Sequence, residues 1–308
     1  MASSPQVALE PRGTRSWLAD AIAAGGGELV DPGAADVLVW AEPAQADRLS
    51  ALLRGDARAV TWVQLPWAGV EPYADVLREH ADRTWTCGKG VYAEPVAEHA
   101  LALLLGGLRG IGRYAREDHW TGPYGTNLLG AKVVIVGGGG IADSLLRLLG
   151  PFGADVTVVR RHPEPMPGAH RVVGIDELDA ALDGAIGVVL AVALTPATVG
   201  IIGAAQFEAI HPRGWLVNVA RGAHVVTDDL VAALDAGTIG GAALDVTDPE
   251  PLPEGHPLWT RANVIVTPHV ANTPEMAQPL LAGRIEENVR RWSKGEALLG
   301  LVDPHVGY

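Results

Sequence analysis

The sequence predicts an α/β protein built from two doubly wound parallel-sheet domains. Three observations predict this class: the chain has 308 residues, hydrophobic residues make up 48% of it, and short apolar runs alternate with helix-like segments. A chain of this length exceeds the usual size of one domain. Its composition allows it to bury a core, so wholesale disorder is excluded.

Charge and cysteine content exclude further classes. The chain has 36 acidic and 23 basic residues, for a net charge of −13, and phosphates would repel it, so we expect no nucleic-acid partner. The single cysteine, Cys87, excludes an intrachain disulfide framework, and no spacing of potential ligands predicts a metal site. Neither a signal-peptide pattern nor a long uncharged apolar stretch occurs, so we expect a cytoplasmic protein without a membrane span.

The first part of the chain, from about residue 7 to 93, alternates between strand-like and helix-like segments. The strand candidates are 37–41, 60–65 and 83–87, and the helix candidates are 44–54 and 72–79. This alternation predicts a parallel sheet with helices on its faces. Residues 94–108 then form a helix candidate whose apolar positions are nearly continuous, which indicates burial on most sides.

Residues from 132 onward repeat the alternation on a larger scale. The strand candidates are 133–136, 155–159, 188–192, 215–219, 242–246 and 264–267, and the helix candidates are 141–149, 176–182, 204–210, 228–236 and 275–292. Six strands with interleaved helices fit a doubly wound sheet. Between the two series, residues 110–130 are polar and aromatic, and we interpret them as an extended arm or loop.

A glycine-rich turn follows the first strand of the second series. Gly137, Gly139 and Ala142 occupy the three positions of the pattern G-x-G-x-x-G/A, and Gly140 and Ile141 begin the next helix. The first glycine permits a tight turn, the second lets a pyrophosphate approach the backbone, and the third small residue lets the helix pack closely on the strand. The helix start offers N–H groups to phosphates. The segment predicts dinucleotide binding, and an ordinary glycine-rich turn is the alternative.

The residues after the next strand bear on the choice of cofactor. NAD sites usually carry Asp or Glu there to bind the adenosine ribose, whereas this chain has Arg160 and Arg161. Arginine at this place can hold a 2′-phosphate, so we expect NADP(H) as the preferred cofactor and NAD(H) as the alternative. Two other interpretations stay open, in which the arginines face solvent or one stacks on adenine.

The last three strands of the series are each followed by a chemically active side chain. These are Arg221, Glu250 and His269, a cation, a carboxylate and an imidazole. In an open α/β sheet, ligands bind beyond the carboxyl ends of the strands, so the three side chains could converge on one crevice. Each alone is more often structural, but the set beside a predicted dinucleotide site indicates catalysis.

At these residues the sequence resembles a family. Segments 218–222 (NVARG), 245–253 (DVTDPEPLP) and 267–269 (TPH) resemble the signature segments of the D-isomer-specific 2-hydroxyacid dehydrogenases, as do 68–70 (AGV), 97–100 (AEHA) and 194–200 (LTPATVG). The spacing of 29 and then 19 residues between Arg221, Glu250 and His269 is similar too. The resemblance covers nearly the whole chain from about residue 36. Within the family, the chain is most similar to glyoxylate/hydroxypyruvate reductases.

The resemblance implies a role for each catalytic candidate. Arg221 would hold the substrate carboxylate and polarise the keto group. His269 would exchange a proton with the substrate oxygen, and Glu250 would hydrogen-bond His269 and favour its protonated form. The nicotinamide would deliver hydride to the keto carbon. The implied reaction is NAD(P)-dependent reduction of a small 2-ketoacid to the D-2-hydroxyacid, or the reverse.

The resemblance also implies contact residues. The substrate residues would be Trp67, Ala68, Gly69 and Arg221, and Leu194, Thr195, Ala220 and Asp245 would join the glycine turn and the two arginines around the cofactor. The backbone N–H groups of Ala68 and Gly69 would bind the carboxylate, and Asp245 would contact the nicotinamide amide. We interpret His99 as a structural histidine.

The implied architecture is a Rossmann dinucleotide-binding domain, residues 96–270, inserted in a smaller flavodoxin-like substrate-binding domain made of residues 1–95 and 271–308. The arm at 110–130 resembles the dimerisation region of the family and implies a homodimer. Two alternatives stay open: a non-enzymatic dinucleotide sensor or corepressor on the same fold, and a family member that acts on another small anion.

Overall fold

The computed structural model describes residues 4–42 and 44–306, and the chain divides into two compact units. The smaller unit comprises Met1–Tyr92 and Thr273–Tyr308, and the larger unit is the inserted segment Ala93–Asn272. Both contain a parallel sheet, so the expected α/β class and the insertion of one domain into the other are confirmed. The boundaries lie within a few residues of the expected ones at 95/96 and 270/271.

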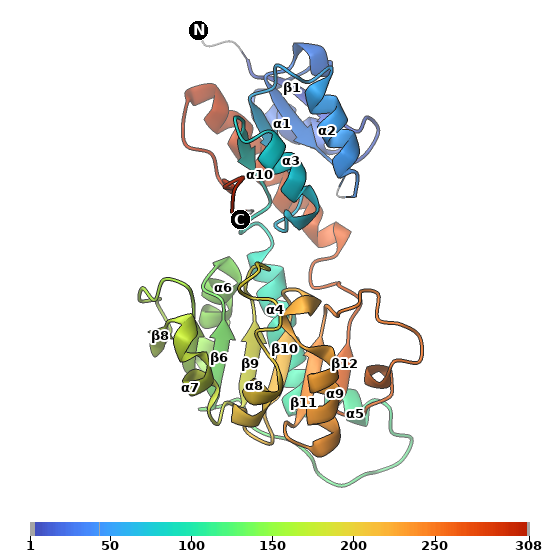
Figure 1. Ribbon diagram of the computed structural model, residues 1–308, viewed down its shortest axis with the longest axis vertical. Helices are drawn as coiled ribbons and strands as arrows, with labels where there is room; N and C mark the ends of the chain where they lie inside the picture. Colours follow the sequence, from blue (N-terminus) through green and yellow to red (C-terminus); the bar gives the residue numbers. More distant parts are fainter. Residues whose placement is uncertain (1–3, 43, 307–308) are drawn as a thin grey trace. The chain divides into compact units, whose positions relative to one another are not determined.

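The smaller unit, whose β1, α1, α2, α3 and α10 are labelled in Figure 1, contains a five-stranded parallel sheet with the order β2-β1-β3-β4-β5, the flavodoxin-like order. Its elements are β1 (Gln6–Glu10), α1 (Leu18–Ala24), β2 (Glu28–Leu29), β3 (Val37–Trp40), α2 (Ala46–Arg54), β4 (Trp62–Gln64), α3 (Ala74–Glu79), β5 (Thr84–Thr86) and α10 (Pro274–Lys294). No helix or strand was predicted before residue 37, so β1, α1 and β2 were missed. The strand β2 has only two residues, both exposed, so it carries no apolar signal.

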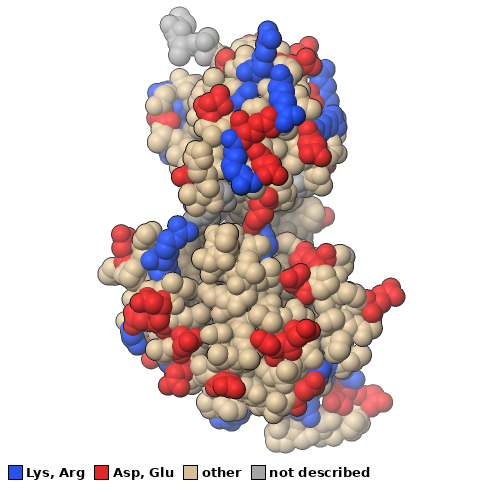
Figure 2. All heavy atoms as spheres, viewed as in Figure 1, with Lys and Arg blue, Asp and Glu red and all other residues tan. Residues whose placement is uncertain are grey.

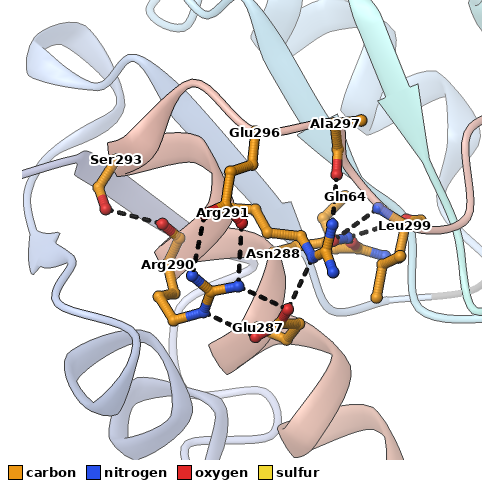
Figure 3. A network of polar contacts seen from close by, with 9 residues as sticks. All are labelled: Gln64, Glu287, Asn288, Arg290, Arg291, Ser293, Glu296, Ala297 and Leu299. Atoms are coloured by element: carbon orange, nitrogen blue, oxygen red, sulfur yellow. Dashed lines mark hydrogen bonds and ion pairs between the residues drawn. The ribbon is translucent and has the colours of Figure 1, made fainter.

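A buried polar network explains why the C-terminal helix α10 returns to this sheet (Figure 3). Asn288 Nδ2 donates to Gln64 Oε1 of β4 at 3.0 Å and to the Leu299 carbonyl at 2.9 Å, and Leu299 N donates to Asn288 Oδ1 at 2.8 Å. Gln64 and Asn288 are both fully buried. Because a buried amide without partners is costly, this pairing fixes the helix and the C-terminal segment on the sheet.

The larger unit is a seven-stranded parallel sheet with the order β12-β11-β10-β9-β6-β7-β8 (Figure 1). Its elements are α4 (Ala93–Leu108), α5 (Ile111–Tyr114), β6 (Lys132–Val136), α6 (Gly140–Leu149), β7 (Asp155–Val159), β8 (Arg171–Val173), α7 (Leu178–Leu182), β9 (Gly187–Leu190), α8 (Ala204–Ala209), β10 (Trp215–Asn218), α9 (Thr227–Ala236), β11 (Gly241–Leu244) and β12 (Val264–Val266). The expectation of six strands was wrong by one, because β8 has only three residues after a proline-rich loop. The strand order reverses between β6 and β9, where doubly wound sheets bind ligands.

Apolar side chains cover both faces of this sheet. Along β6, Val134 and Val136 belong to the core cluster that also contains residues of α7, α8 and α9, whereas Val133 and Ile135 belong to the cluster formed with α4 and α6. Successive strand residues point to opposite faces, so a strand buried on both sides is apolar throughout. Each fully buried Val or Ile contributes about 1.5–3 kcal/mol. The continuous apolar runs in the sequence are therefore central strands.

The arm at residues 110–130 begins with a short helix rather than an extended segment. The helix α5 covers Ile111–Tyr114, and the rest of the segment up to β6 has no helix or strand. Trp120 is fully exposed and Leu129 is 67% exposed. The prediction of an extended arm or loop is therefore wrong for its first turn, which is helical, and the remainder is a loop.

The surface carries charges of both signs. On the face drawn in Figure 2, acidic side chains are spread over both units, and basic side chains are interspersed among them. Within residues 4–42 and 44–306, no helix has the length and apolarity needed to cross a bilayer.

Candidate active site

The three catalytic candidates follow the carboxyl ends of neighbouring strands in the larger unit. Arg221 follows β10, Glu250 lies in the loop after β11, and His269 follows β12. The strand β11 pairs in parallel with both β10 and β12, so the three chain segments leave the sheet at the same edge. The expected convergence thus has its structural basis in the strand order.

His269 and Glu250 form a direct pair. The distance from His269 Nδ1 to Glu250 Oε1 is 2.7 Å, and the two side chains are 52% and 42% exposed. A carboxylate accepts this hydrogen bond from an Nδ1–H group, so the second ring nitrogen, Nε2, is the atom left for another partner. The pair has the chemistry of an oriented acid/base group.

The turn that carries His269 is held by the buried residue Asp245. His269 has a positive φ of 53°, an uncommon conformation for a residue with a side chain. Its backbone N–H bonds the Asp245 carbonyl at 2.8 Å, and the Asp245 carboxylate accepts hydrogen bonds from the N–H groups of Val270 at 2.9 Å and Ala271 at 3.0 Å. The Asp245 carboxylate therefore holds the two residues that follow His269 in the turn.

Two further side chains complete the environment of Asp245. Thr267 Oγ1 donates to Asp245 Oδ1 at 2.6 Å, and His99 Nε2 lies 3.1 Å from Thr267 Oγ1 and 3.4 Å from Asp245 Oδ1. Burial alone would raise the pKa of Asp245, but the hydrogen bonds from His99, Thr267 and the backbone outweigh burial and lower it. His99, which we interpreted as a structural histidine, contacts Thr267 and Asp245 and so supports the turn that carries His269.

The Arg221 segment is anchored by the fully buried Asn218. Asn218 Nδ2 donates to the Arg221 carbonyl at 2.9 Å, and Ala220 N donates to Asn218 Oδ1 at 3.0 Å. A Cβ atom on the next residue, Gly222, would lie 2.0 Å from the carbonyl carbon of Thr247. Only glycine allows this close approach of the Arg221 segment to the loop that leads to Glu250.

The glycine turn has the geometry that dinucleotide binding requires. Gly137 has a φ of 120°, and a Cβ there would lie 2.1 Å from the Ala191 carbonyl oxygen after β9. At Gly139 a Cβ would meet no atom within 4 Å, so this position leaves room for a ligand, and Ala142, in the first turn of α6, is fully buried. The helix α6 begins at Gly140 and continues with Ile141. These residues fit a pyrophosphate at a helix N-terminus.

Arg160 and Arg161 follow β7, beside this turn. A Cβ on Gly138 would lie 2.7 Å from both Cδ and Nε of Arg160, so the Arg160 side chain lies across the glycine turn. Arg160 is half-buried and Arg161 is exposed. In the part of the chain that the structure describes, neither arginine forms an ion pair. Their charges are therefore available to an anionic ligand.

The predicted cofactor residues Leu194 and Thr195 lie in the loop after β9. Thr198 closes this loop, because Thr195 N donates to Thr198 Oγ1 and Thr198 Oγ1 donates to the Ala193 carbonyl, both at 2.8 Å. The buried His224 contacts the same loop. His224 was not among the predicted site residues, and the only signal for it in the sequence is its position three residues after Arg221.

The predicted substrate residues Trp67, Ala68 and Gly69 lie in the smaller unit, in the loop after β4. The Trp67 ring lies 5.6 Å from the Tyr92 ring, and the Arg15 guanidinium lies 4.6 Å from the Trp67 ring centroid. Within residues 4–42 and 44–306, the N–H groups of Ala68 and Gly69 have no hydrogen-bond acceptor. These two donors are available to a carboxylate. Among the residues described, no group of three potential metal-ligating side chains occurs.

Comparison with known proteins identifies the family. The profile of the D-isomer specific 2-hydroxyacid dehydrogenase, NAD binding domain, matches residues 100–271, more than half of the chain. Glyoxylate/hydroxypyruvate reductase A of Photorhabdus laumondii is 38% identical over 197 residues, which are 63% of this chain and 58% of that protein.

Two solved structures match nearly the whole chain. A D-isomer specific 2-hydroxyacid dehydrogenase from Xanthobacter autotrophicus Py2, in complex with NADPH and MES, has a TM-score of 0.84 at 28% identity and covers 99% of this chain and 100% of its own. An NADPH-dependent glyoxylate/hydroxypyruvate reductase from Sinorhizobium meliloti, in complex with NADP and sulfate, has a TM-score of 0.78 at 26% identity, with coverage of 99% and 100%. The fold, the glycine turn and these matches agree: the chain belongs to the D-isomer specific 2-hydroxyacid dehydrogenase family and is an NAD(P)-dependent oxidoreductase.

Proposed function

We propose that the protein is an NADP-preferring reductase of small 2-ketoacids, with glyoxylate and hydroxypyruvate as its substrates and the D-2-hydroxyacid as product. The observation that carries the proposal is the 2.7 Å pair between His269 and Glu250, at the sheet edge that also carries Arg221. The names of the similar reductases from Photorhabdus laumondii and Sinorhizobium meliloti support the substrate class.

Each catalytic side chain has one task in this proposal. Arg221 binds the substrate carboxylate with its fork of N–H donors and stabilises negative charge on the keto oxygen. His269 donates its Nε2 proton to that oxygen in reduction and accepts it in oxidation. Glu250 accepts the Nδ1–H bond, which orients the ring and leaves Nε2 for the substrate. The bound nicotinamide supplies or takes up the hydride.

The cofactor is held by the glycine turn and the loops around it. Gly137, Gly139, Gly140 and Ile141 bind the pyrophosphate, Leu194, Thr195 and Ala220 line the cofactor cleft, and Asp245 contacts the nicotinamide amide. Arg160 and Arg161 bind the 2′-phosphate, which selects NADP(H) and leaves NAD(H) as the weaker alternative. The position of Arg160 across the glycine turn and the NADP(H)-bound relatives support this preference.

The substrate residues predicted in the smaller unit are also part of the proposal. The unpaired N–H groups of Ala68 and Gly69 bind the carboxylate, and Trp67 forms a wall of the pocket. The arm at 110–130 joins two copies in a homodimer, and the exposed Trp120 supports this role. The cytoplasmic location expected from the sequence stays a prediction.

The experiment that tests the proposal is a spectrophotometric assay at 340 nm. Purified protein is mixed with NADPH or NADH and with glyoxylate, hydroxypyruvate, pyruvate or phenylpyruvate. We expect faster oxidation of NADPH than of NADH, and the highest rates with glyoxylate and hydroxypyruvate. Activity with NADH alone would reject the cofactor assignment. Cofactor binding without turnover of any ketoacid would reject the substrate class and favour another small anion.

A further inference from the structure

The inference concerns Arg15, a residue of the smaller unit that the proposed chemistry does not use. Arg15 lies in the loop between β1 and α1, so it follows the carboxyl end of β1. The predicted substrate residues Trp67, Ala68 and Gly69 follow the carboxyl end of β4, and β1 and β4 both pair in parallel with β3. Because parallel strands end at one edge of a sheet, the two loops leave the sheet at the same edge.

The Arg15 side chain contacts the predicted substrate loop directly. Its guanidinium carbon lies 4.6 Å from the centroid of the Trp67 ring, and Trp67 precedes the two N–H donors of Ala68 and Gly69. A cation–π contact is electrostatic, and it leaves the guanidinium N–H groups able to bond an acceptor. The contact therefore fixes the charge of Arg15 beside the loop without using its donors.

A second arginine in the same loop shows the usual arrangement for comparison. Arg12 Nε lies 3.3 Å from Glu10 Oε1, and the Arg12 guanidinium also pairs with Asp31. Arg15 is half-buried, and among the residues that the structure describes its side chain has no ion pair and no hydrogen bond. The loop after β1 thus holds one compensated and one uncompensated positive charge.

The aromatic groups around Arg15 supply no counter-charge. Burial raises the pKa of the Tyr73 and Tyr92 phenols, and the charge of Arg15 acts on both in the opposite direction. The Tyr73 hydroxyl donates to the Glu42 carbonyl and the Tyr92 hydroxyl donates to the Pro66 carbonyl, both at 2.7 Å. Both phenols are therefore neutral, and the positive charge of Arg15 is left for a ligand.

The backbone of Arg15 adds an independent observation. Its φ is 50°, and among the described residues other than glycine only Arg15 and His269 have a positive φ. A residue with a side chain adopts this conformation at an energetic cost, and such residues concentrate at ligand sites. Arg15 shares this property with the proposed acid/base residue.

We propose that Arg15 is a further substrate-binding residue, whose guanidinium binds the carboxylate of the 2-ketoacid together with the N–H groups of Ala68 and Gly69. This inference rests on the proposed function, because it takes the loop after β4 as a carboxylate site. The two oxygens of a carboxylate accept several hydrogen bonds, so two backbone N–H groups and a guanidinium can share them. Arg15 adds the positive charge that the two backbone donors lack.

The first test measures binding without turnover, by isothermal titration calorimetry with oxamate. Oxamate has a carboxylate beside an amide carbonyl, so it resembles a small 2-ketoacid that the nicotinamide does not reduce. Arg15→Gln should weaken its dissociation constant by about 10- to 100-fold, measured with and without NADPH, since charge-assisted hydrogen bonds are strong. Arg15→Lys keeps the charge and loses the fork of donors, so its loss should be smaller.

Two calorimetric outcomes would overturn the proposal. One is an unchanged dissociation constant in Arg15→Gln. The other is failure of the unmodified protein to bind oxamate in either condition. A misfolded variant would lower the binding stoichiometry rather than the affinity, so unfolding and loss of the contact are separable.

The second test separates KM from kcat in the 340 nm assay. A contact that is equal in the bound substrate and in the transition state affects KM alone. Arg15→Gln should therefore raise KM for both glyoxylate and hydroxypyruvate by about 10- to 100-fold and leave kcat within about twofold. A fall in kcat with an unchanged KM would overturn the binding role.

The matched control is Arg78→Gln, which removes the same charge from the same unit. Arg78 is an exposed residue of α3 that pairs with Asp75. We expect its oxamate dissociation constant and its KM values to equal those of the unmodified protein. Equal losses in Arg15→Gln and Arg78→Gln would assign the effect to the net charge of the unit and overturn the proposal.

The two tests also separate this inference from the proposed function. If oxamate binds in an Arg15-dependent manner but no ketoacid is reduced, the proposed function fails and Arg15 keeps its role as a carboxylate-binding residue. If ketoacids are reduced with the same KM in Arg15→Gln, the proposed function holds and the role of Arg15 is refuted.

Discussion

The loops at the carboxyl edges of the two sheets differ in how many of their polar groups have hydrogen-bond partners. In the larger unit, Asn218 bonds the backbone of the loop after β10, Asp245 bonds Thr267 and Val270 and so joins the loops after β11 and β12, and His269 already has Glu250 as a partner. In the smaller unit, the loop after β4 presents the N–H groups of Ala68 and Gly69 without an acceptor, within the part of the chain described.

Under the proposed function, this difference corresponds to two tasks. Groups that move protons need a fixed geometry before the ligand arrives, and the buried hydrogen bonds of the larger unit would provide it. Groups that bind an anion need unsatisfied donors, and the loop of the smaller unit has them. The contrast leads to separate expectations for chemistry, for cofactor choice and for substrate affinity, which single substitutions can test.

The largest expected effect is on chemistry, in His269→Ala. Removing the acid/base group should lower kcat by about 10²- to 10⁴-fold, because a positioned side chain contributes that much to proton transfer. The dissociation constant for NADPH should stay unchanged, measured by calorimetry beside kcat at saturating ketoacid. An unchanged kcat in His269→Ala would show that the His269–Glu250 pair at the edge of the larger sheet does not carry the chemistry.

The next effect is on cofactor choice, in Arg160→Gln and Arg161→Gln. Losing a charge-assisted contact to the 2′-phosphate should lower the ratio of kcat/KM for NADPH to that for NADH by about 10- to 100-fold. Arg171→Gln is the matched control, since Arg171 is an exposed residue of β8 whose partner is Glu177. Equal ratios in all three variants would contradict the phosphate role of Arg160 and Arg161.

A smaller effect is expected at the edge of the smaller unit, in Trp67→Leu. The indole packs against Tyr92 and Arg15, and each such contact is worth about 0.5–1.5 kcal/mol. The KM for the ketoacid should rise by about three- to tenfold, while the dissociation constant for NADPH stays the same. A loss of cofactor affinity without a change in KM would contradict the division of tasks between the edges.

The smallest effect concerns the stability of the larger unit in acid. Folding lowers the pKa of Asp245, so its carboxylate contributes stability that is present above its unfolded pKa of about 3.9 and is lost as the pH falls through the lower folded value. Denaturant titrations should therefore show that the free energy of unfolding falls less steeply below about pH 4 in Asp245→Asn than in the unmodified protein. Asp228→Asn, at an exposed position in the first turn of α9, should keep the original slope.

The sequence predicted those features that are continuous along the chain. The glycine turn at Gly137 could be found because a strand, a turn and a helix follow directly on one another. Arg221, Glu250 and His269 could be found because each follows an apolar strand and belongs to a signature segment. The structure adds that the neighbouring strands bring the three segments to one edge.

The features that sequence reasoning missed depend on contacts between distant residues or on short elements. His224 contacts the carbonyl oxygens of Thr198 and Val192, 26 and 32 residues earlier in the chain. Every residue has a backbone carbonyl, so the sequence does not indicate which ones a side chain contacts. Asp245 was predicted to contact the nicotinamide, and its contacts with Val270 and Ala271 depend on a turn that no local pattern indicates. The strand β8 is short and begins with the exposed Arg171, so it shows no continuous apolar run.

The measurement that tests the central claim most directly follows the transferred hydrogen. Hydroxypyruvate is incubated with the protein and NADPH that carries deuterium at the transferable position of the nicotinamide, and the product is analysed by mass spectrometry and chiral chromatography. The account predicts glycerate of the D configuration with one deuterium on carbon 2. Recovery of unreacted hydroxypyruvate with bound NADPH, of product without deuterium, or of the L configuration would contradict it.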